Sequence, residues 1–318
     1  MLRTRLTDLF DLRYPVLSAP MAMHSGGRLA AAVSNASGLG LFGGINNAGP
    51  AWVREQIQLV RSQTGRPFGV GFITAFVPAF QAHFEIALEE RVPAIALSFG
   101  DPGPLVAMAK QSGAKVICQV QAMEHAHQAV EAGADVLVVQ GNEAGGHTGT
   151  NELLPLLATA RERFPAMPVV AAGGIASGAA LATVLKLGAD GAWLGTALMA
   201  TPEAVEVADS YKQRILASDG NDTVYTEVFD IATGVPWPPG IAGRAYRNRF
   251  AQEWHGREDE LRARREEIAP SYAAAEQRRD TDVAAVFMGL GAGDVNEIRP
   301  AADVVRSICD EAERLLAR

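Results

Sequence analysis

The stretch ADVLVVQGNEAGGHTGT, residues 134–150, decides how the rest of the sequence is interpreted. Its first half is a continuous apolar run that ends at Gln140, and its second half places one histidine, His147, among glycines. A continuous apolar run, unlike an alternating one, is typical of a strand that is buried on both faces, as in parallel sheets covered by helices. A buried strand that leads into glycine-rich backbone with a titratable side chain indicates a ligand site at the end of that strand.

Seven further runs of this kind recur along the chain, with helical patterns between them. They are YPVLSA (14–19), LGLFGG (39–44), PFGVGFI (67–73), PAIALSF (93–99), AKVICQV (114–120), MPVVAAGG (167–174) and GAWLGT (191–196). The intervening segments, such as 27–37 and 51–65, carry apolar residues at three- and four-residue spacing, and several end in glycine. Eight such units predict an α/β protein with a (β/α)₈ TIM barrel. A doubly wound open sheet is the alternative, but the first unit lacks a GxGxxG sequence.

The regular alternation of strands and helices stops near residue 212. From there the sequence becomes polar and rich in Pro and Gly, through VPWPPGIAGRAYRNRF (235–250), and then turns into the charged helical stretch HGREDELRARREEI (255–268). We therefore expect an inserted, mainly helical cap domain at residues 212–283. The TIM barrel would be built from residues 1–211 and 284–318.

The composition limits the class of partner. The 318 residues are 48% hydrophobic and 20% charged, and the formal net charge of −8 leaves no basic stripe for nucleic acid. No apolar run is long enough to cross a membrane, and the N-terminal segment lacks the apolar stretch of a signal peptide. The two cysteines, Cys118 and Cys309, have neither metal-ligand spacing nor the density of a disulfide scaffold. We expect a cytoplasmic monomer or homodimer that binds a small molecule, without a membrane, nucleic acid or metal.

Two consecutive predicted strands end in residues that could hold an anion. One leads into Gly173 and Gly174, and the next into Gly195 and Thr196. In TIM barrels ligands bind at the C-terminal ends of the strands, and phosphate sites commonly lie in the loops after strands seven and eight. Backbone N–H groups at a helix N-terminus attract anions. A phosphate site is therefore predicted here, the alternative being that these glycines only form tight turns.

Six segments together resemble the nitronate monooxygenase family, formerly called 2-nitropropane dioxygenases. They are APMAMHSGGRLAAAVSNASGLG (19–40), GNEAGGHTG (141–149), PVVAAGGIASG (168–178), GAWLGTALMATPE (191–203), TVYTEVFD (223–230) and FMGLGAGDV (287–295). The resemblance implies a capped TIM barrel with FMN as its cofactor. It also implies oxidation of alkyl nitronates, such as propionate 3-nitronate, by molecular oxygen to a carbonyl compound and nitrite.

The resemblance assigns roles to individual residues. His147 would be catalytic, taking a proton from a neutral nitroalkane or, when protonated, attracting a nitronate anion; the alternative is a histidine that only stabilises its loop. The implied flavin contacts are Ala19, Pro20 and Met21 at the isoalloxazine ring, Gln119 at its pyrimidine side, Gly145 and Gly146 through backbone, Gly173, Gly174, Gly195 and Thr196 at the phosphate, and Gly289, Gly291 and Ala292 in the late segment. The expected substrate lining is His24, Phe72, Phe76, Tyr225 and Trp237.

Two positions depart from the pattern of the family. Gly71 stands where many relatives have Asn, and Gln119 stands where many have Lys, which removes a side-chain contact and a fixed positive charge from the flavin. The choice of substrate therefore stays open. The alternatives are an NAD(P)H:quinone reductase or an enoyl-thioester reductase on the same FMN barrel, and a flavin-free barrel that binds phosphate.

Overall fold

Eight parallel strands form the predicted barrel, and each predicted run contains one of them. In the computed structural model, which describes residues 2–317, they are β1 (Val16–Ser18), β2 (Gly40–Gly43), β3 (Phe68–Ile73), β4 (Ala94–Ser98), β5 (Lys115–Val120), β6 (Val136–Gln140), β8 (Val169–Ala172) and β9 (Gly191–Leu194). They pair in the order β1-β9-β8-β6-β5-β4-β3-β2. A parallel bridge between Leu17 and Leu39 joins the two ends of this row, and the Ser18 N–H donates to the Leu39 carbonyl over 3.1 Å. The sheet is therefore a closed (β/α)₈ TIM barrel and not an open doubly wound sheet.

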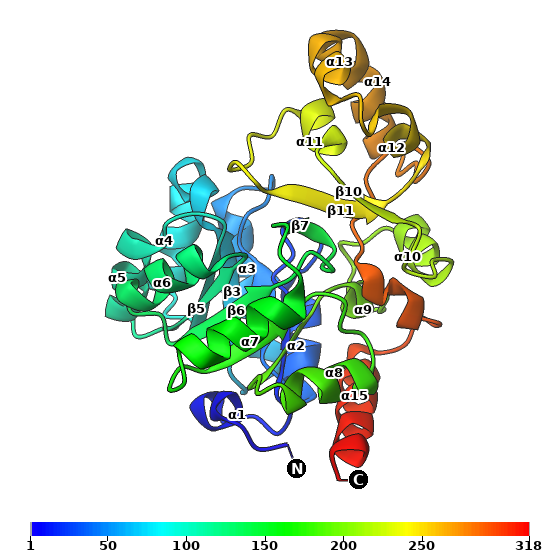
Figure 1. Ribbon diagram of the computed structural model, residues 1–318. Helices are drawn as coiled ribbons and strands as arrows, with labels where there is room; N and C mark the ends of the chain where they lie inside the picture. The colour runs from blue at the N-terminus through cyan, green and yellow to red at the C-terminus, as the bar shows by residue number, and fades with distance from the viewer. Residues whose placement is uncertain (1, 318) are drawn as a thin grey trace.

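Helices follow the strands and cover the outside of the barrel (Figure 1). They are α2 (Gly27–Asn35), α3 (Pro50–Gln63), α4 (Gln81–Glu89), α5 (Gly103–Gln111), α6 (Met123–Ala132), α7 (Leu153–Arg163), α8 (Gly178–Lys186) and α15 (Ala301–Leu316). Shorter helical pieces are η1 (Thr74–Phe80), α9 (Thr196–Met199) and η2 (Leu290–Asp294). The last helix, α15, packs between α8 and α2, so the ring of helices is completed by chain that follows the cap.

The strands divide their apolar side chains between two cores. One core lies between the strands and the helices, and the other fills the barrel with side chains such as Leu17, Ile117 and Trp193. Because successive side chains of a strand point to opposite faces, both sets come from the same strands, which is why the runs in the sequence are continuous. Cys118 and Cys309 are free and buried, and burial raises the pKa of Cys118 to about 12.

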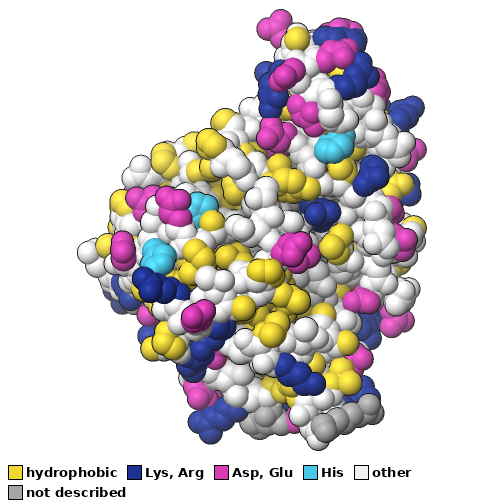
Figure 2. Space-filling view, viewed as in Figure 1, with side chains coloured by type: hydrophobic (Ala, Val, Ile, Leu, Met, Phe, Trp, Pro, Cys, Tyr) yellow, Lys and Arg dark blue, Asp and Glu magenta, His cyan; other side chains and the backbone are white. Residues whose placement is uncertain are grey.

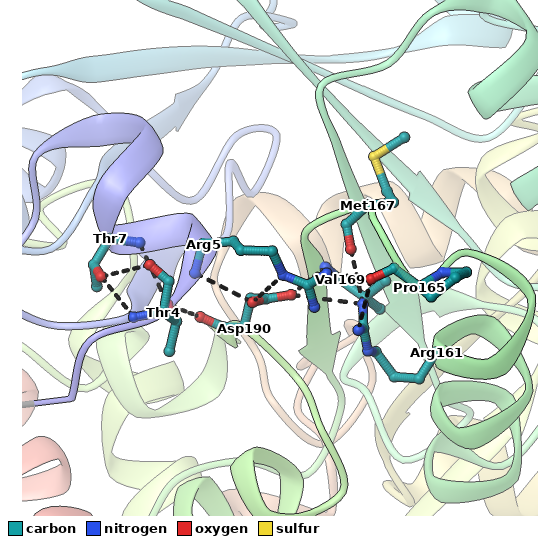
Figure 3. A network of polar contacts seen from close by, with 8 residues as sticks. All are labelled: Thr4, Arg5, Thr7, Arg161, Pro165, Met167, Val169 and Asp190. Carbon is teal, nitrogen blue, oxygen red and sulfur yellow. Dashed lines mark hydrogen bonds and ion pairs between the residues drawn. The ribbon is translucent and has the colours of Figure 1, made fainter.

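The short helix α1 (Arg5–Phe10) covers the end of the barrel opposite the cap (Figure 1). Its side chains Leu6 and Phe10 belong to the interior core. Figure 3 shows the polar network that fixes the helix to the barrel around the buried Asp190 carboxylate. That carboxylate accepts hydrogen bonds from the Arg5 Nε over 2.9 Å and from the Val169 N–H over 2.9 Å. One buried carboxylate thus connects the helix, a barrel strand and the turn before β9.

The cap is attached to the barrel through a small antiparallel sheet. Its elements are α10 (Asp209–Leu216), β10 (Thr223–Thr226), α11 (Val228–Thr233), β11 (Ala242–Tyr246), α12 (Arg249–Trp254), α13 (Glu258–Ala263) and α14 (Arg265–Gln277). Strand β11 pairs with β10 on one side and with β7 (Gly146–Thr148), from the loop after β6, on the other. In Figure 1 this sheet lies between the barrel and the cap helices. The cap is mainly helical as expected, but its sheet includes β7, a strand from a barrel loop. The expected boundary at residue 212 falls inside α10.

The surface agrees with the charge balance of the sequence. On the face drawn in Figure 2, basic and acidic side chains are interspersed over both the cap and the barrel. Within residues 2–317 no helix is long and apolar enough to span a bilayer.

Replacing Asp190 with Asn should lower the free energy of unfolding by about 2–3 kcal/mol, because the buried network loses its negative charge and one of its two accepting oxygens becomes an NH2 donor. Urea denaturation at pH 7 measures the change. The matched control is Asp8→Asn on α1, the helix that Asp190 anchors; this change removes an exposed pair with Arg3 and should cost less than about 1 kcal/mol. Equal losses in the two variants would contradict the anchoring role of Asp190.

Candidate active site

A cavity of about 410 Å³ lies at the C-terminal ends of the barrel strands, beneath the cap. The loops after β1, β6, β8 and β9 form its barrel side, and α11, α14 and the loop after α11 form its cap side. It brings together most of the residues predicted for the site. Those that line it are Ala19, Pro20, Met21, His24, Gln119, Gly145, Gly146, His147, Gly173, Gly174, Gly195, Thr196, Trp237 and Gly291.

Three expected lining residues, Phe72, Phe76 and Tyr225, lie elsewhere. Phe76, on η1, packs edge-on against Trp237 with ring centroids 5.1 Å apart and does not itself line the cavity. Phe72 is only 2% exposed and packs edge-on against Phe84, with ring centroids 5.2 Å apart, in the core between β3 and α4. Tyr225 does not reach the cavity either, because its hydroxyl donates to the Thr148 carbonyl over 3.1 Å and so joins β10 to β7. Phe72 supports the barrel wall, and Tyr225 holds the cap sheet. The expectation that they line the substrate pocket is therefore corrected.

Glycines allow the rim segments to pack backbone against backbone. A Cβ atom on Gly145 would lie 2.4 Å from the Gly289 nitrogen, and one on Gly289 would lie 2.4 Å from the Glu143 carbonyl oxygen. The Gly289 N–H also donates to the Thr196 hydroxyl over 3.1 Å. Gly289 and the fully buried Ala292 therefore lie behind the rim and support it, instead of lining the cavity as expected.

Two other glycines face open space inside the cavity. A Cβ atom on Gly146 would meet no atom within 4 Å. One on Gly195 would meet only the Ala19 Cβ at 3.7 Å and the Met21 Sδ at 3.9 Å, both of which are ordinary contacts. A flat ring or an anion can therefore approach the backbone closely at these two positions. The residues present fit a flavin in this respect.

His147, on β7, is held at its ring and at its backbone. Its Nε2 lies 2.8 Å from the Asp230 Oδ1, and the two side chains are only 11% and 14% exposed. Its carbonyl accepts a hydrogen bond from the Gln140 Nε2 over 3.1 Å, and the Gln140 Oε1 accepts one from Gln121 over 3.0 Å. The carboxylate partner determines which ring nitrogen carries the proton, leaving the other for a ligand.

Sequence reasoning missed the partner of His147 and much of the cap side of the cavity. Asp230 is the last residue of TVYTEVFD, a segment that carries the family resemblance, so the signal was present without a role attached to it. Other lining residues that were not predicted include Ser98, Phe99, Gln140, Phe229, Thr233, Val235, Tyr272, Glu276 and Phe287. Most of these belong to the cap, where an apolar residue that faces a cavity has the same sequence pattern as one in the core.

The charged groups around the cavity are mainly acidic. His24 is partly buried at the mouth, and its desolvation there lowers its pKa, although the hydrogen bond from its Nδ1 to the Ala22 carbonyl opposes the shift. Burial raises the pKa of Glu276, and Arg279 opposes that shift. Among the lining residues, the carboxyl groups are those of Asp230 and Glu276, and the lining contains no Lys or Arg. Among residues 2–317, no cluster of His, Cys, Asp and Glu could hold a metal ion.

The comparisons with known proteins identify the family. A family model described as nitronate monooxygenase matches residues 3–79 and 72–311. This chain belongs to the nitronate monooxygenase family. A probable nitronate monooxygenase of Staphylococcus saprophyticus is 30% identical over 309 residues, which cover 82% of this chain and 83% of that protein.

A second curated relative has a different substrate in its name. The (3aS,4S,5R,7aS)-5-hydroxy-7a-methyl-1-oxo-octahydro-1H-indene-4-carboxyl-CoA dehydrogenase of Mycobacterium tuberculosis is 35% identical over 232 residues, 72% of this chain. The chain spans 64% of the length of that relative. Both relatives are oxidoreductases by name, and they differ in what they oxidise.

Two solved structures match nearly the whole chain. FabK from Thermotoga maritima superposes with a TM-score of 0.87 at 31% identity and covers 100% of this chain and 98% of its own. A nitroalkane oxidase from Streptomyces ansochromogenes gives 0.82 at 30% identity, with 97% and 98% covered. The family supports an oxidoreductase on a TIM barrel, and the names of the relatives do not specify one common substrate.

Proposed function

We propose that this protein is an FMN-dependent oxidoreductase that oxidises alkyl nitronates, such as propionate 3-nitronate, with molecular oxygen to a carbonyl compound and nitrite. The family supports this class of reaction. The single observation that carries the proposal is the imidazole of His147, held by Asp230 at a cavity that is also lined by the open glycine backbone of Gly146 and Gly195. FMN, when bound, supplies the redox chemistry, while the protein supplies orientation and proton transfer.

The residues of the rim can hold FMN along its whole length. The phosphate would bind to the N–H groups of the two glycine turns and to the Thr196 hydroxyl, and Gln119 would face the pyrimidine side. Ala19, Pro20 and Met21 would pack against the ring. A Cβ atom on Gly71 would lie 2.2 Å from the Pro20 ring, so the Asn common in the family at this position would displace Pro20. The residue at position 71 and Pro20 therefore constrain each other.

His147 can act on the substrate through its second ring nitrogen. With Nε2 donating to Asp230, Nδ1 carries the lone pair, and within residues 2–317 it makes no hydrogen bond. A neutral ring can take the acidic proton of a nitroalkane, which gives the nitronate. A protonated ring offers an N–H and a positive charge to a nitronate oxygen. Asp230 keeps the ring oriented for either role.

A second candidate is a thioester substrate, as in an enoyl-thioester reductase on the same FMN barrel. The cavity favours it in one respect, because its lining contains no Lys or Arg to bind a nitronate anion and has a glutamine at 119. A neutral acyl group needs no such charge, and the apolar cap side chains Phe229, Val235 and Phe287 fit it. A relative whose name specifies a CoA thioester supports the same candidate.

Anaerobic mixing of the FMN-loaded protein with propionate 3-nitronate should bleach the flavin absorbance, and oxygen should restore it with release of nitrite. Parallel mixing with NADH and NADPH, followed by a quinone or crotonyl-CoA, tests the alternatives. Bleaching by a reduced nicotinamide followed by turnover of crotonyl-CoA, with none from the nitronate, would establish the second candidate. A colourless protein that cannot be loaded with FMN would exclude both.

Replacing His147 with Asn should lower kcat for neutral nitroalkanes by about 10²–10⁴-fold, because the proton acceptor is lost. Asp230→Asn should lower it less, since the ring stays and only its orientation weakens. Turnover is measured per bound flavin, and FMN retention should change little. The matched control is His125→Asn, at an exposed helical position outside the cavity. Unaltered turnover per flavin in His147→Asn would rule out its catalytic role.

Replacing Gly195 with Ala should weaken FMN binding by about tenfold or more, because the new methyl group occupies space in the cavity that the cofactor needs. The methyl group clashes with no protein atom, so the stability of the apoprotein should change little. Titration of free FMN, followed by its fluorescence, measures the dissociation constant. The control is Gly65→Ala, where a Cβ likewise clashes with no protein atom, having none within 4 Å, but which lies outside the cavity. Equal affinities in both variants would place FMN elsewhere.

A further inference from the structure

A short proline-rich segment of the cap, residues 234–240, connects α11 to β11 and is here called the flap. It reads GVPWPPG and begins and ends with glycines in the left-handed region, at φ 76° for Gly234 and φ 79° for Gly240. Between them three prolines fix the backbone φ angles around Trp237. A stiff segment between two permissive residues can move as a unit by rotation at its ends.

The Trp237 side chain joins the flap to the barrel. Its indole stacks on the His147 ring, with centroids 3.6 Å apart and planes 13° from parallel. It also packs edge-on against Phe76, on η1, and against Phe99, after β4, at centroid distances of 5.1 and 5.2 Å. The backbone φ of Phe99 is 61°, a conformation that a bulky residue rarely adopts. The indole therefore docks on two side chains of the barrel mouth, one of which is held in a strained conformation.

This arrangement leaves His147 closed to a substrate on most sides. Trp237 covers one face of the ring, Phe287 lies 5.2 Å from it at a 49° tilt, and Asp230 occupies Nε2. The side chain is 11% exposed. A substrate that is to contact the face of the ring covered by Trp237 needs the indole to move.

We infer that Trp237 is a gating and positioning residue for His147. The flap rotates at Gly234 and Gly240, which uncovers the imidazole for a substrate. It then returns to stack on the ring, which excludes water and fixes the ring orientation during proton transfer. The docking of the indole on Phe76 and Phe99 sets the closed position and limits the size of substrate that the closed site accepts. The identity of the substrate rests on the proposed function, whereas the covering of His147 does not.

The covering can be measured without any turnover, from the rate at which diethyl pyrocarbonate modifies His147 in the FMN-loaded protein, followed by peptide mass spectrometry. Trp237→Ala should raise this rate by about tenfold, and Phe76→Ala by about threefold, as expected for the loss of one aromatic stacking or docking contact. The exposed His125 serves as the internal standard. Phe80→Ala is the matched control, because Phe80 lies in the same short helix but packs on His83.

Trp237→Phe keeps an aromatic ring over His147 and should retain most of the protection, which also guards against a folding defect in the alanine variant. In Trp237→Ala, kcat should fall while the ratio of kcat/KM for a bulky to a small substrate rises by about tenfold, because the size limit is removed.

Equal modification of His147 in wild type and Trp237→Ala would overturn the covering. A wild-type His147 that stays unmodified long after the exposed His125 has reacted completely would overturn the movement. Absence of nitronate turnover with the modification pattern intact would reject the proposed substrate and leave the gate standing.

Discussion

The pairing of β7 with β11 is the constraint on which the candidate site depends. It places His147 opposite Gly243 and so brings a residue of a barrel loop into the sheet of the cap. A Cβ atom on Gly243 would lie 2.8 Å from the Phe287 ring and 3.6 Å from the His147 Nε2. The absence of a side chain at this position therefore makes room for both rings. With the pairing in place, Asp230 on α11 of the cap reaches the imidazole.

The barrel and the cap contribute different physical properties to the cavity. The barrel provides backbone that is fixed by closure of the sheet and by glycine contacts of the kind seen between Gly145 and Gly289. The cap provides the carboxylate and the aromatic side chains, carried on short helices and on a loop. A cofactor held for the lifetime of the protein needs the first kind of surface, and a substrate that binds and leaves at each turnover needs the second. The rigid barrel surface therefore suits the cofactor, and the more mobile cap surface suits the substrate.

The sequence predicted the barrel well because both faces of a parallel strand are buried, so each strand appears as a run of apolar letters. It could not predict β7, whose three residues carry no such run and become a strand only through pairing with β11. The placement of Phe72 failed for a related reason. In β3, Val70 and Phe72 face the helices, while Gly71 faces the barrel interior. A continuous apolar run does not show which alternate residues face the helices and which face the interior. The glycine turns and His147 were placed at the cavity because strand ends converge in every TIM barrel.

The electrostatics of the cavity connect the choice of substrate with the position of the flap. With Gln119 in place of the family's common lysine, no permanent positive charge lies in the lining, and Asp230 and Glu276 contribute carboxyl groups. An anionic substrate then depends on the protonated form of His147 for its binding, and stacking by Trp237 controls access to that same ring. A neutral thioester depends on His147 only for a proton and gains from the apolar cap side chains. Whichever substrate is used, the imidazole and the indole above it are the two groups that it must meet together, so selectivity is set at their contact and not at the glycine rim.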